Sequence, residues 1–284
     1  WYAAMGRHLE ELCDLQKKYR CPVVIAGDIF DRWEVPSQLV TFALENLPSH
    51  CYAVPGQHDL PHHNYADMDR SAYGVLVAAK KITTLEPDKP VVSDMNDIIW
   101  FYGFPWGAEL GPCRPSPSSA STDIHLAVVH KYCWKSGHSY PKAPQQNNYA
   151  SLLKKLTGYT AAVFGDNHRG FLSSYRGTSL LNCGTFMRRH ADEEDYTPQV
   201  GLLLQNGDIL PYELKAPKHD VFAVKQNDLK TGELNLDHFM AELTDLEANA
   251  IDFVAVCKHF LKQHDVHRRT QAIILNAIES HDEA

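Results

Sequence analysis

The stretch VVIAGDIFDR, residues 23–32, decides the fold. Its first four residues form an uninterrupted apolar run, which is typical of a strand buried on both faces in a parallel sheet. Gly27 then lets the backbone turn, and Asp28 follows it directly. Because α/β sheets bind ligands beyond the carboxyl ends of their strands, we expect Asp28 to lie at a ligand site.

The residues around this strand predict a β-α-β unit. Apolar residues at positions 5, 9, 12 and 13 recur at helical spacing before the strand, and Cys21-Pro22 ends that pattern. A second amphipathic helix is expected from Ser37, which is a suitable cap, to Leu47. A short strand over residues 52–54 follows. The order of elements places the chain in the α/β class.

The same reasoning extends along the rest of the chain. Strands are expected over residues 98–104, 124–129, 161–164 and 178–182, with a helix over 149–156. Asn206-Gly207, between two apolar runs, predicts a hairpin, and the proline- and serine-rich residues 111–122 predict a surface loop. Beyond Pro217 we expect a strand at 221–224 and helices at 236–246, 251–261 and 270–278. The predicted domains are therefore residues 1–216 and a small α+β appendage of residues 217–284.

Composition restricts the class of protein. A net charge of -8 argues against a general basic surface that holds nucleic acid, although carboxylates that bind cations are compatible with it. No apolar run reaches the roughly 18 residues of a membrane helix, so we expect no membrane partner. The seven cysteines are an odd number without a CxxC pair, which favours reduced thiols in an intracellular protein.

Polar side chains follow four of the predicted strands. Asp28 follows the first, PGQHD (residues 55–59) the second, His130 ends the third, and GDNH (residues 165–168) follows the fourth. A hard divalent cation takes carboxylate, amide oxygen and neutral imidazole ligands. One such segment alone is equally compatible with a turn, a cap or a hydrogen-bonded core histidine. The ordered set of four favours a metal site.

These motifs resemble the calcineurin-like metallophosphoesterases, whose ordered pattern is DxH, GDxxD, GNHD or GNHE, a lone His, and GHxH. The resemblance covers residues 27–168 and four of the five motifs. GDIFDRW and VPGQHDLP are most similar to the SbcD-type repair nucleases, including viral ones. The resemblance implies a β-sandwich flanked by helices, two divalent ions, with Mn²⁺ ahead of Mg²⁺, and an exonuclease or endonuclease that acts on DNA in repair or recombination.

The resemblance also implies roles for individual residues. Asp28 would bridge the two ions, His168 would face one of them, and the other would be held by Gln57, His130 and Asp166. His58 would contact the phosphate, as general acid or as a stabiliser of the transition state, and Asp31 would support the site from behind. Arg32 could touch phosphate or be structural. The other basic residues that could hold a phosphate backbone of DNA, or could simply face water, are Lys131, Arg188 and Arg189.

Three positions depart from the family pattern. Gln57 stands where the family has asparagine, and Asp166 stands where it has histidine, which shifts the preference toward a harder ion. No Asp-x-His precedes Gly27. Either the first strand lies upstream of Trp1, which we expect, or one metal lacks two ligands and the protein is a one-metal or inactive form.

Three tryptophans lie near the motif loops: Trp33, Trp106 and Trp134. Two interpretations stay open for them, stacking on nucleobases and ordinary packing under a loop.

The resemblance implies DNA and an SbcC-like coiled-coil ATPase as partners, and a second copy of the chain in a homodimer is another candidate. We expect the protein in the cytoplasm, which is the host cytoplasm for a viral protein. Two other functions remain open. A phosphatase or small-molecule phosphodiesterase uses the same fold and is favoured by the negative charge. A catalytically weak binding protein is suggested by the three departures.

Overall fold

The computed structural model describes residues 1–93, 95, 98–139, 143–188, 193, 195–215 and 217. The chain divides into two units, Trp1–Val224 and Lys225–Ala284. The second unit lies outside the described residues, and so do the strand and the three helices predicted beyond Pro217. The appended domain therefore stays a prediction, and the fold below is that of the first unit.

The amino-terminal part forms a small parallel sheet covered by helices. Helix α1 (Tyr2–Tyr19) leads into β1 (Val23–Ala26), and α2 (Ser37–Asn46) leads into β2 (Cys51–Val54). After the 3-10 segments η1 (Pro61–His63) and η2 (Tyr65–Arg70), helix α3 (Ala72–Ala78) leads into β3 (Ile82–Thr84). The three strands pair in parallel in the order β1-β2-β3. The predicted β-α-β unit is confirmed.

A second, larger sheet follows in the order β4-β5-β6-β7-β9-β8. Strands β5 (Ile99–Phe104), β6 (Ile124–His130), β7 (Ala161–Gly165) and β9 (Thr178–Asn182) run parallel, whereas β4 (Val91–Val92) and β8 (Phe171–Tyr175) are antiparallel edge strands. The 3-10 turn η3 (Gln145–Asn147) and helix α4 (Tyr149–Leu153) lie between β6 and β7 in the chain. The carboxyl ends of β6 and β7 therefore point the same way.

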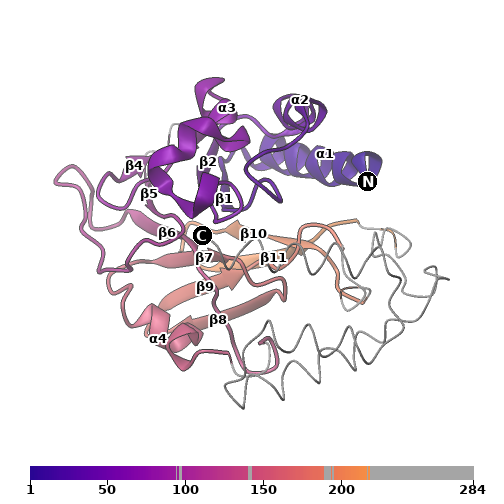
Figure 1. The fold of residues 1–284 in the computed structure, drawn as a ribbon. Helices are drawn as coiled ribbons and strands as arrows, with labels where there is room; N and C mark the ends of the chain where they lie inside the picture. Colours follow the sequence, from indigo (N-terminus) through magenta and orange to yellow (C-terminus); the bar gives the residue numbers. More distant parts are fainter. Residues whose placement is uncertain are drawn as a thin grey trace, which may run out of the picture. The chain divides into compact units, whose positions relative to one another are not determined.

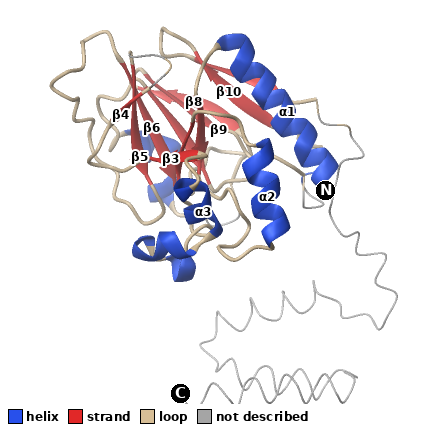
Figure 2. Ribbon diagram, turned by 90° about the horizontal axis from the view of Figure 1, so that it is seen from above, coloured by secondary structure: helices blue, strands red, loops and turns tan. Residues whose placement is uncertain are grey.

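The two sheets pack face to face, and helices cover their outer faces. Alternation along β6 shows this directly: Leu126 and Val128 lie in a core shared with Val54 of β2, whereas Ala127 and Val129 lie in a core shared with the α4 region. A third core joins α1, α2 and α3 to the small sheet. Figure 1 shows the three helices beside β1 and β2, with α4 on the far side of the larger sheet, and Figure 2 shows the helices lying across the strands. The architecture is the expected β-sandwich flanked by helices.

Two hairpins complete the unit. Strands β10 (Gln199–Leu203) and β11 (Ile209–Glu213) pair antiparallel around the predicted Asn206-Gly207 turn, where Gly207 has φ 86°. Strands β8 and β9 join through Arg176 and Gly177, both with positive φ, as two-residue hairpin turns require. The second hairpin was missed because Arg-Gly is a weaker turn signal than Asn-Gly.

Two details of the sequence prediction were wrong. The residue that caps α2 is Pro36, and Ser37 is already the first helical residue without a capping hydrogen bond. The helix expected over 149–156 begins where predicted, with Asn148 as its cap, but it ends at Leu153. Residues 154–156 form a turn and a bend instead. Among the described residues, no helix is both long enough and apolar enough to span a membrane.

Candidate metal centre

Four loops bring polar side chains together where β1, β2, β6 and β7 end. Asp28, His130 and Asp166 each offer a ligand atom, and these atoms all lie within 4.8 Å of one another. Gln57 lies between them, because its side-chain Nε2 donates to Asp166 at 3.0 Å and its Oε1 lies 2.7 Å from His130 Nε2. The sequence-predicted residues of four separate segments therefore meet in one place.

His130 presents its Nε2 atom to this cluster. Its other ring nitrogen, Nδ1, lies 2.6 Å from the carbonyl oxygen of Ala26, an atom that can only accept, so Nδ1 carries a proton. Nε2 faces the oxygen of Gln57 at 2.7 Å and a carboxylate oxygen of Asp28 at 3.4 Å. Because these oxygens are acceptors, Nε2 either carries a proton or shares a metal cation with them.

The pKa values of the cluster also indicate that it favours a positive charge next to Asp28. Burial disfavours the imidazolium of His130, but the hydrogen bond and charge of Asp28 outweigh it and raise the pKa of His130. Burial likewise works against the Asp28 carboxylate, yet His130 and His58 lower its pKa. His130 is only 2% exposed, so the site stabilises positive charge away from bulk water.

The donor set fits a hard divalent cation. Two carboxylates, an amide oxygen and a neutral imidazole are the ligands that Mn²⁺ and Mg²⁺ accept in proteins, and no thiolate lies among them. Asp28, Gln57, His130 and Asp166 are the residues that would hold it. Gln57 as a ligand and Asp28 as a bridge between two ions remain predictions from the family resemblance.

Gly27 lets the β1 loop pass close to His130. Its φ is 89°, and a Cβ atom at this position would lie 2.0 Å from His130 Nδ1. Gly177, in the β8–β9 turn, has a φ of 85° with no heavy atom within 4 Å of its Cβ position. The two glycines therefore share the unusual backbone conformation, but only at Gly27 would a side chain also collide with a residue of the cluster.

This difference gives a matched pair of variants. Left-handed backbone strain should lower the free energy of unfolding by about 1–2 kcal/mol in both Gly27→Ala and Gly177→Ala. Gly27→Ala should cost more than Gly177→Ala, because its Cβ would overlap the buried ring of His130. Gly27→Ala alone should also displace His130 and weaken Mn²⁺ binding by about 10–100-fold. Calorimetric Mn²⁺ titration and chemical denaturation of both variants test this. Equal Mn²⁺ affinities in the two variants would refute the role given to Gly27.

Asp59 joins two of the loops, and sequence reasoning missed it. The residue is fully buried, and its carboxylate accepts three backbone hydrogen bonds, from Ile29 at 3.3 Å, Phe30 at 3.0 Å and Gly56 at 2.9 Å. Burial raises the pKa of Asp59 to about 7, against the opposing effect of these donors. Its position at the end of PGQHD was visible, but the partners thirty residues away were not.

Two buried amides hold the other loops. The side chain of Asn167 donates to the carbonyl oxygens of Cys133 and His138, both at 2.8 Å, and so ties the β7 loop to the β6 loop. Asn182, at the end of β9, donates to the carbonyl oxygens of Asn167 at 2.7 Å and Arg169 at 3.1 Å. The conformation of the Asp166 loop, where Asp166 has φ 87°, is thus fixed from both sides.

His168 is placed differently from the other predicted ligands. It is not in the group of ligand atoms that lie within 4.8 Å of one another among the described residues. Its Nδ1 lies 3.1 Å from a carboxylate oxygen of Glu193, a buried residue that sequence reasoning did not single out. A carboxylate on Nδ1 fixes the proton there and leaves Nε2 as the atom suited to bind a metal. The role of His168 as the ligand of a second ion stays a prediction.

The remaining predicted site residues lie at the rim or inside the protein. His58 is exposed, and its backbone N–H donates to Asp28 Oδ1 at 3.1 Å, so it stands beside the cluster. Asp31 and Arg32 are exposed and Lys131 is half-buried. Arg188 is 4% exposed and donates to the carbonyl oxygen of Pro217, a placement that favours a structural role. Arg189 lies outside the described residues.

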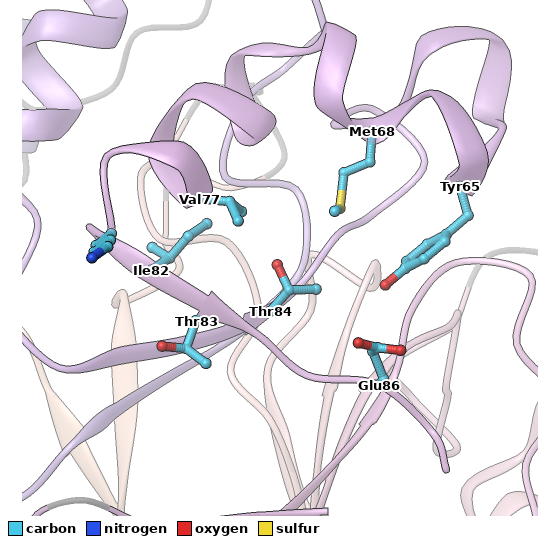
Figure 3. Close-up of a pocket in the computed structure, with 8 residues that line it drawn as sticks. Tyr65, Met68, Val77, Ile82, Thr83, Thr84 and Glu86 are labelled. Carbon is cyan, nitrogen blue, oxygen red and sulfur yellow. The ribbon is translucent and has the colours of Figure 1, made fainter. Parts of the chain in front are cut away.

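A hollow of about 490 Å³ lies elsewhere, between η2, α3 and β3. Figure 3 shows Met68 and Tyr65 reaching into it from one side and Thr84 and Glu86 from the other. None of the candidate metal ligands lines it. Its other lining residues are Val77, Lys80, Ile82 and Thr83. The candidate metal centre is therefore identified by its ligand side chains and not by this hollow.

Comparison with known proteins agrees with this geometry. The model of the calcineurin-like phosphoesterase family matches residues 5–170, which include all four strand ends. No curated protein matches the chain.

Two solved structures show a distant likeness. One is described as a novel archaeal phosphodiesterase, with 10% identity, a TM-score of 0.37 and coverage of 73% of this chain and 92% of that chain. The other is the phosphopantetheinyl hydrolase PptH of Mycobacterium tuberculosis, with 12% identity, a TM-score of 0.36 and coverage of 57% and 78%.

Proposed function

Because this chain belongs to the calcineurin-like phosphoesterase family and is therefore a metal-dependent phosphoesterase, we propose that it hydrolyses the phosphodiester bonds of DNA. The observation that carries the chemistry is the meeting of Asp28, Gln57, His130 and Asp166 at one edge of the sandwich. The similarity of GDIFDRW and VPGQHDLP to SbcD-type nucleases supports DNA as the substrate.

The surroundings of the cluster support a long substrate. His58 and His63 are exposed beside it, and so is Trp106, whose ring lies near that of His130. These exposed groups are available to contact the parts of a strand that flank the cleaved bond. We propose two divalent ions, with Mn²⁺ the first candidate, and an SbcC-like ATPase as partner of the appended domain.

Each residue then has a defined task. A bound divalent cation supplies Lewis-acid stabilisation of charge on the phosphate and activates water. Asp28, Gln57, His130 and Asp166 hold it, with His130 oriented by Ala26. His58, anchored through its backbone to Asp28, donates a proton to the departing oxygen or a hydrogen bond to the phosphate.

The test offers the purified protein three substrates in the presence of Mn²⁺: single-stranded DNA, duplex ends, and a small chromogenic phosphodiester. DNA cleavage that is abolished by chelation and lost in both Asp28→Ala and His58→Ala supports the proposal. Turnover of the small ester alone would replace it with the second candidate, a small-molecule phosphodiesterase, which the net charge of -8 favours. Metal binding without turnover of any substrate would make the protein a binding module.

A further inference from the structure

Trp106 is an exposed aromatic residue in contact with the candidate metal centre. It is 37% exposed and lies in the turn after β5, whereas the aromatic side chains of β5 itself are buried. The centre of its ring lies 6.4 Å from that of His130, at an interplanar angle of 64°. One part of the indole therefore lies next to a buried candidate ligand while another part meets solvent.

The position of Trp106 is fixed by the backbone. Its N–H donates to the carbonyl oxygen of Pro55 at 3.1 Å, which ties the turn after β5 to the residue just before Gly56 and Gln57. The turn that contains Trp106 is closed by Ala108, whose N–H donates to the carbonyl oxygen of Pro105 at 3.0 Å. The backbone of Trp106 is thus held beside the loop of Gln57 before any substrate arrives, which lowers the entropy lost on binding.

A second planar group stands beside it. The ring centre of His63 lies 6.5 Å from that of Trp106, and His63 is exposed. His63 has φ 57°, a conformation that is costly for a residue other than glycine, and its Nδ1 lies 2.9 Å from the carbonyl oxygen of Gln57. This bond ties the imidazole to the loop of another candidate ligand.

We propose that Trp106 and His63 form a stacking subsite for the nucleobase of the nucleotide that is held at the metal centre. This inference rests on the proposed function, because it names the part of the DNA that this side of the site would recognise. A planar base stacks on an indole without regard to its sequence, which suits a nuclease that reads backbone and not bases. The indole N–H of Trp134 donates to the carbonyl oxygen of Pro144 at 2.8 Å, so packing against its own loop accounts for this residue.

The experiment compares an ordinary oligonucleotide with one that has an abasic residue beside the cleaved bond. Stacking on one base is worth about 1–3 kcal/mol, or roughly 5–150-fold. Trp106→Leu should raise KM for the ordinary oligonucleotide by that factor, with kcat little changed, and should leave cleavage at the abasic residue unaltered. Trp106→Phe should restore most of the loss. Equal effects of Trp106→Leu on both substrates, or none on either, would overturn the subsite.

A binding measurement separates this proposal from the proposed function. Fluorescence titration of the protein with a deoxynucleoside monophosphate and with deoxyribose phosphate reports the contribution of the base without cleavage. If no DNA is cleaved but the nucleotide binds more tightly in a Trp106-dependent manner, DNA hydrolysis fails and the subsite stands. If DNA is cleaved and the two ligands bind equally, the subsite fails and DNA hydrolysis stands.

Discussion

Asp28→Ala should abolish Mn²⁺-dependent phosphodiester hydrolysis while the protein stays folded. The carboxylate of Asp28 is one of three ligand atoms that lie within 4.8 Å of one another, and it faces His130 Nε2 at 3.4 Å. A bound metal contributes several kcal/mol to transition-state stabilisation, so its loss should lower kcat by about 10²–10³-fold or more. Initial rates on a small chromogenic phosphodiester, together with calorimetric Mn²⁺ titration, measure both effects.

Two controls sharpen this prediction. Asp28→Asn keeps the volume and one oxygen but removes the negative charge, and it should lose most of the Mn²⁺ affinity. Asp208 is exposed in the β10–β11 turn, and Asp208→Ala should leave activity unchanged. An Asp28→Ala protein that keeps more than about a tenth of the activity would show that the reaction does not depend on this cluster.

Asp59→Ala should cause the largest loss of stability among single changes near the site. The substitution leaves the backbone N–H groups of Ile29, Phe30 and Gly56 without their acceptor. At about 1–3 kcal/mol for each of the three buried unsatisfied groups, we expect a loss of about 3–9 kcal/mol in the free energy of unfolding. This corresponds to a fall in Tm of roughly 6–36 °C for a unit of this size. Chemical denaturation with a single probe of the first unit measures it.

An exposed aspartate gives the matched control. The side chain of Asp14 is 68% exposed and pairs with Lys17, so Asp14→Ala should change the free energy of unfolding by less than about 1 kcal/mol. Asp59→Asn keeps one acceptor and should fall between the two. If Asp59→Ala costs no more than Asp14→Ala, the buried carboxylate does not hold the two loops together.

The sequence predicted the parts of this protein that depend on local pattern. Apolar runs gave the strands that end at Asp28, His130 and Asp166, because strands buried on both faces read as continuous apolar segments. The parallel order of elements placed their carboxyl ends together. Strands β3, β4 and β8 were missed: β3 and β4 have only three and two residues, and the two serines of β8 (FLSSY) interrupt its apolar run.

The groups that hold the site in shape could not be predicted, because their partners are distant in the chain. Asp59 binds residues about thirty positions earlier, and Asn182 binds the loop that follows β7. The carboxylate of Glu193 meets His168 across twenty-five positions. Local patterns identify the residue types that bind metal, whereas the hydrogen bonds that aim them depend on how the sheets and loops come together.

We expect Asp28, Gln57, His130 and Asp166 to bind a divalent cation. Anomalous X-ray diffraction from crystals of the protein grown with Mn²⁺ tests it most directly. We expect a manganese peak within bonding distance of Asp28, His130 Nε2 and Asp166, and no peak there in crystals of Asp28→Ala. A peak located only elsewhere, or an ordered cluster that keeps its mutual hydrogen bonds at saturating Mn²⁺, would contradict the claim.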